Sequence, residues 1–316
     1  MTHHPTRSTR RIQSDSGGLI DTWVYPATSG TSNVEPGARL SPAIVMAHGI
    51  GGIKAAGLAP FAEAFSAAGY TCLVLDYRNW GDSEGEPREL LSLRAQLDDY
   101  RTVLRHAREM EGVDPERIFV WGTSFAGMHV IELAASEDYL AGAIAQCPLV
   151  DGLAGLTNVP LSRGVRLMRE SALDRLGARL GWAPRYLPLI VGEDEFGVIA
   201  TSDALRGLEQ LRPTDGTPWP NRITARSLLD VTFARPVRRA AKARCPLLMV
   251  VAEDDTMAPT RPAVRVSARA PRGELYRSRG GHYDVYAGGL DHEHVLAVEL
   301  AFLERVSQRL ATTTTK

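Results

Sequence analysis

One serine lies in a setting that could make it a nucleophile. Ser124 has Gly122 two positions before it and Ala126 two positions after it, in the segment Val-Trp-Gly-Thr-Ser-Phe-Ala-Gly. A serine between small residues at a strand-to-helix turn is forced into a strained conformation, which lifts its hydroxyl clear of the sheet. This pattern is that of a nucleophile elbow, with alanine in the last slot instead of glycine. Taken alone, the pentapeptide is equally compatible with a serine that caps a helix.

The chain also holds a base and an acid that could activate this serine. A serine hydroxyl is a poor nucleophile until a histidine takes its proton, and a carboxylate must orient that histidine. In sheets with such an elbow, the acid follows the serine along the chain and the histidine comes last. His282 follows two glycines that allow a tight turn, and Asp255 follows an apolar run, so they are the candidate base and acid. The alternatives are Asp254 as the acid and a surface turn position for His282.

Acyl transfer also needs hydrogen-bond donors for the oxyanion that develops on the substrate. The backbone N–H of Phe125, directly after the serine, would lie at a helix N-terminus. Ile50 is the candidate second donor, because the segment His-Gly-Ile-Gly-Gly at 48–52 lets the backbone approach closely. His48 is interpreted as a structural residue that holds this loop.

Other polar residues are interpreted as structural. Lys54 follows the glycines of the loop but lacks the Gly-Lys-Ser/Thr pattern of a phosphate-binding loop. Asp76, Arg78 and Asp82 are interpreted as a charge cluster at the sheet edge. No group of histidines, cysteines and carboxylates has metal-ligand spacing, so we expect neither a metal nor a cofactor.

Composition and charge narrow the class of protein. The chain has 316 residues, of which 44% are hydrophobic and 23% charged, and its net charge is -1. This is typical of a globular protein, and it gives no reason to expect nucleic acid or a membrane as a partner. The three cysteines lie in or beside apolar runs, which favours reduced thiols in a cytoplasmic protein. We expect a small-molecule substrate and consider a homodimer.

The order of apolar runs and helical patterns indicates the fold. Nearly continuous apolar strands that alternate with helices are typical of a parallel sheet with helices on both faces. We therefore predict an α/β fold with a mostly parallel sheet of about eight strands, including an edge hairpin over residues 11–26. Reactive groups collect at the carboxyl ends of such strands. The predicted strands are 43–47, 71–75, 118–121, 141–145, 247–251 and 274–276, and the predicted helices outside the insertion are 61–68, 91–110, the helix that starts at 125, and 292–310.

One connection is too long for a simple crossover. Residues 151–244 hold no convincing strand, so we predict a helical lid inserted into a core of residues 1–150 and 245–316. We expect this lid to build an apolar acyl pocket over Ser124. Trp182 and Trp219 are the candidate substrate-binding residues, because they lie in Pro/Gly-rich connections; the alternative is that the large apolar side chains form the lid's own core. The predicted lid helices are 162–180, 202–211 and 226–244.

Taken together, these motifs resemble the α/β-hydrolase superfamily. The resemblance rests on the elbow around Ser124, the loop at 48–52, Asp255 four residues before a proline, and the Gly-His pair at His282. The segment 76–85, Asp-Tyr-Arg-Asn-Trp-Gly-Asp-Ser-Glu-Gly, is similar to that of lidded serine hydrolases related to Xaa-Pro dipeptidyl-peptidase-like and polyketide-associated acyl hydrolases and transferases. The resemblance covers about residues 40–305 and is faint within the lid.

The resemblance implies a serine hydrolase that cleaves an ester or thioester through an acyl-serine. An acyltransferase or cyclase, or an amide-cleaving peptidase, on the same triad is the alternative within this class. A non-catalytic small-molecule-binding protein on the same fold is the alternative of another class. A complete set of serine, acid and histidine in the expected order argues against a binder, which needs none of the three.

Overall fold

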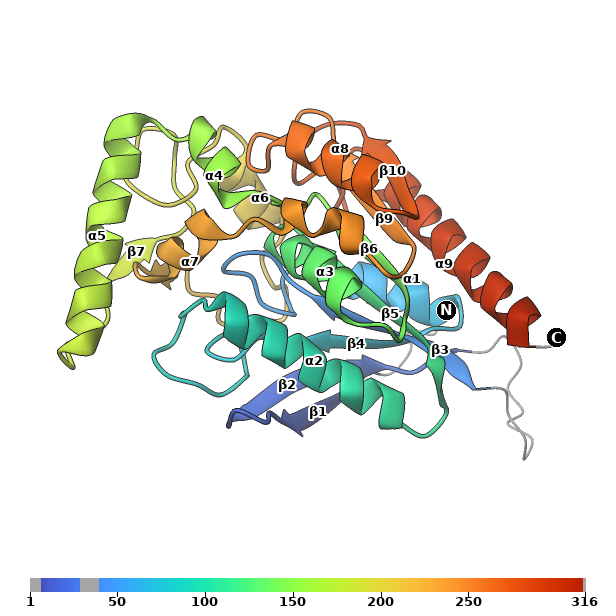
Figure 1. Cartoon of the computed structure of the whole chain (residues 1–316). Coiled ribbons are helices and arrows are strands. Elements are labelled where there is room, and N and C mark those ends of the chain that lie inside the picture. The colour runs from blue at the N-terminus through green and yellow to red at the C-terminus, as the bar shows by residue number, and fades with distance from the viewer. Residues whose placement is uncertain (1–6, 29–39, 315–316) are drawn as a thin grey trace.

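One sheet of eight strands forms the centre of the computed structural model, which describes residues 7–28 and 40–314 (Figure 1). The strand order is β1-β2-β4-β3-β5-β6-β9-β10; β2 pairs antiparallel with both β1 and β4, and every other pair of neighbours in this sheet is parallel. This confirms the prediction of a mostly parallel sheet with an edge hairpin. The strands are β1 (Ser8–Gln13), β2 (Leu19–Tyr25), β3 (Ser41–Ala47), β4 (Thr71–Leu75), β5 (Val113–Thr123), β6 (Leu140–Gln146), β9 (Leu247–Ala252) and β10 (Gly273–Ser278).

Helices cover both faces of this sheet and create two apolar cores. Along β3, Val45 faces the core on one side, whereas Ile44 and Met46 face the core on the other, because successive side chains of a strand point to opposite faces. The first core includes α2, α3 and α8, and the second includes α1 and α9. These helices are α1 (Ala59–Ala67), α2 (Leu93–Glu109), α3 (Phe125–Ser136), α8 (Thr260–Arg269) and α9 (His292–Thr314).

Some element boundaries differ from the predicted ones. Strand β5 begins at Val113, five residues before the predicted start, and pairs with β3 across an irregularity near Ala43. Helix α2 begins at Leu93 because the side chain of Ser92 accepts a hydrogen bond from the backbone N–H of Ala95 and so caps the helix. Helix α9 continues to Thr314, beyond the predicted end at residue 310.

The segment 151–244 lies between β6 and β9 and gathers at the end of the molecule opposite the chain termini (Figure 1). Two of its three predicted helices form as α5 and α6, but the third is broken, because Pro236 starts a separate 3₁₀ turn. The expectation of no strand here was wrong: β7 and β8 pair as a short antiparallel ribbon. The elements are α4 (Gly152–Gly155), α5 (Leu161–Arg179), β7 (Tyr186–Pro188), α6 (Ala204–Gln210), β8 (Arg222–Thr224), α7 (Ser227–Phe233) and 3₁₀ turns at Leu156–Asn158, Pro236–Arg238 and Ala240–Lys242.

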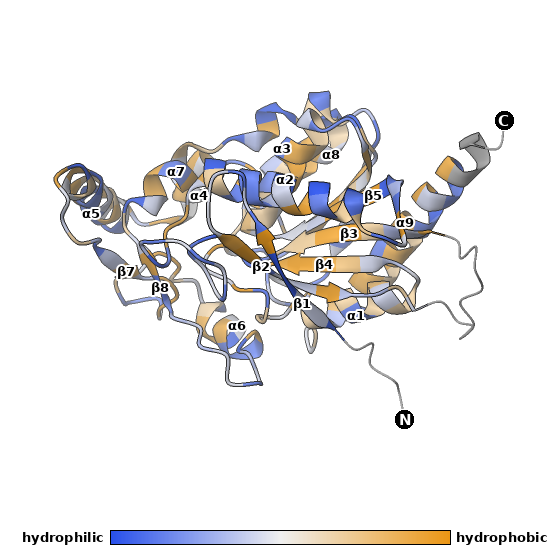
Figure 2. Ribbon diagram, turned by 90° about the horizontal axis from the view of Figure 1, so that it is seen from below, coloured by the Kyte–Doolittle hydropathy of each residue, from blue (hydrophilic) through white to orange (hydrophobic). Residues whose placement is uncertain are grey.

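Hydropathy follows the layers of the fold. Strands β3 and β4 are mainly hydrophobic, whereas α2 and α5 carry hydrophilic and hydrophobic residues together (Figure 2). Within residues 7–28 and 40–314, no helix combines the length and the apolar character that crossing a bilayer would require.

Candidate active site

Ser124 lies at the turn between β5 and α3, in a backbone conformation that serine rarely adopts. Its φ is 56°, in the region that favours glycine. The turn is tight: a Cβ on Gly122 would lie 2.7 Å from the backbone of Ala126, and a Cβ on Gly49 would lie 2.9 Å from the Cβ of Ser124. The methyl group of Ala126 fits in this turn. The neighbouring segment comes close at Gly127 instead, where a Cβ would lie 2.6 Å from the side chain of Pro148.

The loop after β10 brings His282 to this serine. Gly280 has a φ of 78°, and the N–H of Gly281 donates a hydrogen bond of 2.8 Å to the carboxylate of Asp284, which fixes the turn. The imidazole is almost fully buried, and its Nε2 lies 3.0 Å from the Oγ of Ser124. A histidine in this position can accept the proton of the serine hydroxyl.

The loop after β9 brings Asp255 to the other ring nitrogen. Its Oδ2 lies 2.8 Å from the Nδ1 of His282, and its Oδ1 accepts hydrogen bonds from the backbone N–H groups of Met257 and Ala258, at 2.9 and 2.7 Å. Asp254, the alternative from the sequence, is exposed. The structure therefore brings Ser124, His282 and Asp255 together in one chain of hydrogen bonds.

Opposing effects set the pKa of His282. Burial lowers the pKa of the imidazole, but the negative charge and hydrogen bond of Asp255 raise it, as does the charge of Asp203, and the net result is a raised pKa. Asp255 therefore stabilises the protonated ring. The same hydrogen bond favours the tautomer with the proton on Nδ1, which leaves Nε2 free to accept from Ser124.

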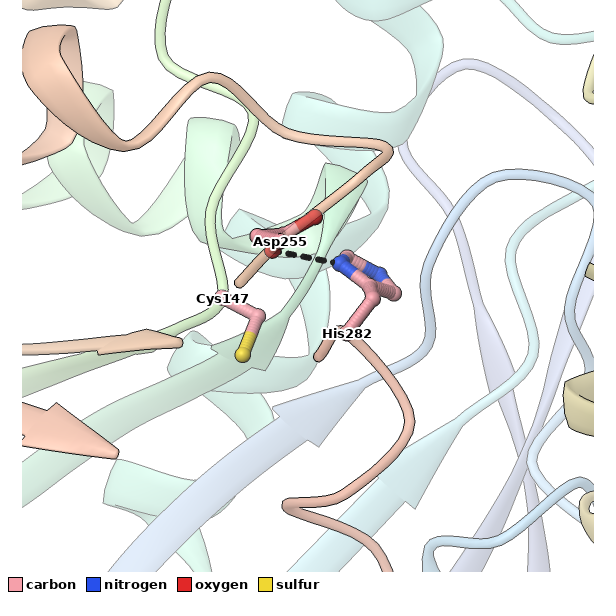
Figure 3. A group of neighbouring side chains, drawn as sticks. All are labelled: Cys147, Asp255 and His282. Atoms are coloured by element: carbon pink, nitrogen blue, oxygen red, sulfur yellow. Dashed lines mark hydrogen bonds and ion pairs between the residues drawn. The ribbon is translucent and has the colours of Figure 1, made fainter. Parts of the chain in front are cut away.

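Three neighbouring side chains are of types that can bind a metal ion. Ligand atoms of Cys147, Asp255 and His282 all lie within 4.8 Å of one another (Figure 3). Asp255 and His282, however, already form a hydrogen bond with each other, and burial together with the charge of Asp255 raises the pKa of the Cys147 thiol. A neutral thiol is a weak metal ligand. The group therefore fits an acid–base pair better than a metal site.

The two candidate oxyanion donors lie beside the serine. Phe125 is the first residue of α3, and Ile50 lies in the turn after β3, where the N–H of Gly52 donates to the carbonyl of Gly49. Ile50 and Phe125 line the same cavity as Ser124 and His282. Backbone N–H groups at such positions can stabilise a developing oxyanion.

A buried lysine that the sequence analysis did not assign to the site anchors the end of the loop at 48–52. The Nζ of Lys54 lies 2.6 Å from carboxylate oxygens of both Asp76 and Asp82, and 3.0 Å from that of Asp21. The backbone N–H of Lys54 also donates to Asp76, at 2.6 Å. Arg78, predicted to belong to this cluster, instead pairs with Asp99. The position of Lys54, two residues after the loop at 48–52, was the feature of the sequence that could have indicated this role.

His48 lies inside this loop and remains neutral. Burial lowers its pKa, and this outweighs the nearby charge of Asp76, 3.8 Å away, which raises it. Its Nδ1 hydrogen-bonds with the carbonyl of Gly49. This geometry is consistent with the structural role expected for His48.

A cavity of about 150 Å³ opens beside Ser124, between the sheet and the segment 151–244. Its lining is mostly apolar and includes side chains from the core and from the insertion. Its lining includes Leu149, Leu167, Met168, Val198, Ile199 and Arg163.

The two tryptophans named from the sequence have different positions. Trp219 lines a second, smaller cavity of about 40 Å³ that also contains Ser124 and His282, and its indole N–H donates to the carbonyl of Gly51 at 2.7 Å. Trp182 is 65% exposed, lies over Gly177 at the end of α5 and lines neither cavity, so its position does not support a substrate-binding role. The Trp182 side chain packs on Gly177, near the end of the helix that precedes it.

A buried carboxyl lies behind the nucleophile strand. Glu299 of α9 accepts a hydrogen bond of 3.1 Å from the indole N–H of Trp121 in β5. Its other oxygen, Oε1, has no hydrogen-bond partner among the described residues. Burial raises the pKa of Glu299 to about 8, and the bond from Trp121 only partly opposes this. The side chain is therefore uncharged at neutral pH.

Known proteins resemble this chain over most of its length. The protein family described as serine aminopeptidase, S33 (Hydrolase_4) matches residues 38–281. The quorum-quenching protein AidA of Acinetobacter baumannii is 37% identical over 84% of this chain and 87% of its own. The polyketide transferase grgF of Penicillium sp. is 30% identical over 95% of this chain and 96% of its own.

Structural similarity and a further relative agree with this grouping. The crystal structure of the α/β hydrolase GrgF from Penicillium sp. sh18 superposes with a TM-score of 0.79 at 28% identity, covering 95% of this chain and 98% of that one. The thiohydrolase aneE of Aspergillus aculeatus is 26% identical over 85% of this chain and 87% of its own. The chain is thus an enzyme that belongs to the α/β-hydrolase superfamily, in the serine aminopeptidase S33 family.

Proposed function

We propose that the protein cleaves an ester or thioester of a small molecule through an acyl-serine intermediate on Ser124. The observation that carries this proposal is the hydrogen-bonded series from Ser124 to His282 to Asp255, with distances of 3.0 and 2.8 Å. The names of the relatives also support it, since one is a thiohydrolase and another a polyketide transferase.

Each of these residues has a defined role in the proposed reaction. His282 takes the proton of the Ser124 hydroxyl as the oxygen attacks the carbonyl carbon, and Asp255 stabilises the imidazolium that results. The N–H groups of Ile50 and Phe125 donate to the oxyanion of the tetrahedral intermediate. His282 then gives its proton to the leaving oxygen or sulfur, and the acyl group remains on Ser124. Water, activated by His282, attacks this acyl-serine and releases the acid.

We also propose that the chain divides into a hydrolase core of residues 1–150 and 245–316 and a lid of residues 151–244. Leu167 and Met168 of α5, together with Leu228 of α7, line the cavity beside Ser124. This supports an apolar acyl pocket built partly from the lid. Two other large apolar side chains of this segment do not line the cavity: Phe233 is exposed, and Phe196 lies under the guanidinium of Arg166.

Transfer of the acyl group to an acceptor other than water is the second candidate. The smaller cavity adjoins Ser124 and His282 on the side of Trp219, and Tyr283 and Tyr286 line it. A small alcohol or amine bound there would compete with water for the acyl-serine. Product analysis with added short alcohols separates the two reactions, because transfer yields a new ester and hydrolysis yields only the acid.

Covalent labelling tests the nucleophile. An organophosphonate should modify Ser124, and mass spectrometry should locate the adduct on the peptide that contains it. Ser124→Ala should lower turnover of p-nitrophenyl esters and acyl thioesters by about five to six orders of magnitude, because the triad acts as a unit. Ser202→Ala, at an exposed serine, is the control and should retain full activity. An adduct on another serine would contradict the proposal.

A further inference from the structure

The cavity of about 150 Å³ beside Ser124 has one feature that the binding of an apolar acyl chain does not explain. Among its described lining residues, only Arg163 and His282 have ionisable side chains, and no aspartate or glutamate is present. His282 belongs to the proposed triad. Arg163 therefore remains as the charged hydrogen-bond donor of a mostly apolar wall, whose other polar side chains besides Ser124 and His282 are the hydroxyls of three threonines: Thr201, Thr232 and Thr256.

The guanidinium of Arg163 lies where two parts of the wall meet. Arg163 is in the first turn of α5, and its Nη2 donates a hydrogen bond to the backbone carbonyl of Glu193. The loop that contains Glu193 continues into Val198 and Ile199, which line the cavity, while α5 contributes Leu167. This hydrogen bond lies at an exposed position and ties the guanidinium to the loop that continues into the lining residues Val198 and Ile199.

Arg163 differs from other arginines of the insertion in its partners. Arg185, Arg226 and Arg235 each pair with a carboxylate of the insertion, at 2.5, 2.8 and 2.7 Å. In the part of the chain that the structure describes, no carboxylate oxygen lies within 4.0 Å of the Arg163 guanidinium. A guanidinium has five N–H donors, so the bond to Glu193 leaves most of its capacity unused.

From these contacts we infer that the acyl group of the substrate carries an oxygen acceptor along its chain, away from the scissile carbonyl, and that Arg163 donates hydrogen bonds to it. This inference rests on the proposed function and names its substrate class. A keto oxygen and a carboxylate share the required chemistry. A keto group is neutral and a carboxylate is charged, so the two acceptors are tested separately.

The test compares matched p-nitrophenyl esters of equal chain length. One series ends in methyl, one carries a keto group at successive positions along the chain, and one ends in a carboxylate. For the best-placed acceptor, kcat/KM of the wild-type protein should exceed that of the methyl-ended ester by about tenfold, since a hydrogen bond to a charged group contributes strongly to recognition. In Arg163→Met the ratio of the two kcat/KM values should fall to about one, and Arg163→Lys should restore part of it.

A neighbouring arginine provides the control. Arg166→Met changes an exposed residue of the same helix that lies over Phe196 and does not line the cavity, so it should leave the ratio unchanged. The inference is supported if the wild-type protein prefers either acceptor and Arg163→Met abolishes that preference. If only the carboxylate is preferred, the preference should weaken with added salt. An equal fall on all esters, or no wild-type preference, would overturn it. Turnover of the methyl-ended ester through Ser124 tests the proposed function separately.

Discussion

Ser124 is held in place by its own backbone. A positive φ on a residue other than glycine costs on the order of 1–3 kcal/mol, so the surrounding structure must fix it. The N–H of Ser124 donates to the carbonyl of Gln146 at 2.7 Å, and the carbonyl of Ser124 accepts from Gly127 and Leu149 at 3.1 and 3.2 Å. These bonds join β6, α3 and the following loop to one residue. The side chain is therefore free to interact with His282 alone.

The choice between two adjacent aspartates can be tested through the pH profile. Turnover requires neutral His282, so the rate should rise with pH through the raised pKa of this residue. Asp255→Asn removes the charge that raises this pKa. We expect this variant to lose several orders of magnitude in kcat and to shift the remaining profile toward lower pH.

Asp254→Asn is the matched control, because Asp254 is exposed one residue earlier in the chain. Its rate should stay within a few-fold of the wild type, and the midpoint of its profile should not move. The two variants are compared by steady-state kinetics across pH on one ester. A larger effect at Asp254 than at Asp255 would contradict the geometry.

Single residues differed in how far the sequence could predict them. The sequence pointed to Ser124 and Asp255 because each follows an apolar strand, and to His282 because it follows two glycines late in the chain, in the order serine, acid, histidine. The orientation of Trp182 was not predictable, because a Pro/Gly-rich connection indicates where a helix ends but not in which direction the indole points. The pairing of Lys54 was also hidden, because its three carboxylates lie up to 33 residues away along the chain.

At the scale of elements, the loop after β3 depends on an anchor outside itself. Lys54 and Asp76 fix its end, and a Cβ on Gly81 would lie 2.1 Å from the Asp76 carboxylate, so the cluster is tightly packed. Burial lowers the pKa of Lys54, but Asp76, Asp82 and Asp21 raise it, and the net pKa is raised. The lysine is therefore charged, and its charge is balanced by the buried carboxylates of Asp76 and Asp21 and the exposed carboxylate of Asp82.

Removal of this charge should affect both stability and catalysis. Lys54→Met leaves Asp76 buried without its partner, which should reduce the free energy of unfolding by about 3–5 kcal/mol. It should also lower kcat more than it changes KM, because the loop carries the Ile50 N–H. Thermal unfolding and steady-state kinetics measure these effects, with Lys242→Met at an exposed lysine as the control. An unchanged unfolding temperature would rule out the anchoring role.

Long apolar patterns predicted elements better than short ones. The core strands are continuous apolar runs, which favour buried parallel strands over other structures. The ribbon of β7 and β8 has three residues in each strand, too few for a periodic pattern, and Pro188 ends the first of them. In the region predicted as one helix over 226–244, Pro236 separates α7 from two 3₁₀ turns.

For the whole molecule, the contact between the sheet and α9 couples stability to pH. The pKa of Glu299 is about 8 in the folded protein, compared with an ordinary value of 4.5. Between these values the folded state binds a proton that the unfolded state releases. The contribution of Glu299 to the free energy of unfolding should therefore be largest below about pH 4.5. It should decrease as the pH rises toward 8.

Glu299→Gln should remove this part of the pH dependence, because the amide keeps the acceptor for Trp121 and cannot ionise. Urea unfolding at several pH values measures the slope, and Glu304→Gln, an exposed residue of the same helix, should retain the wild-type slope. Identical slopes in the wild type and Glu299→Gln would show that the carboxyl does not titrate in this range.

The pairing of Trp121 with Glu299 also gives the protein an intrinsic optical reporter. An indole whose N–H faces a neutral carboxyl at low pH and a carboxylate at high pH emits differently in the two states. The emission of Trp121 should therefore change near the pKa of about 8. Trp80 donates to a backbone carbonyl that does not ionise, so its emission should not report this titration. Glu299→Gln should abolish a fluorescence change of the unlabelled chain near this pH if the change arises at the contact between α9 and β5.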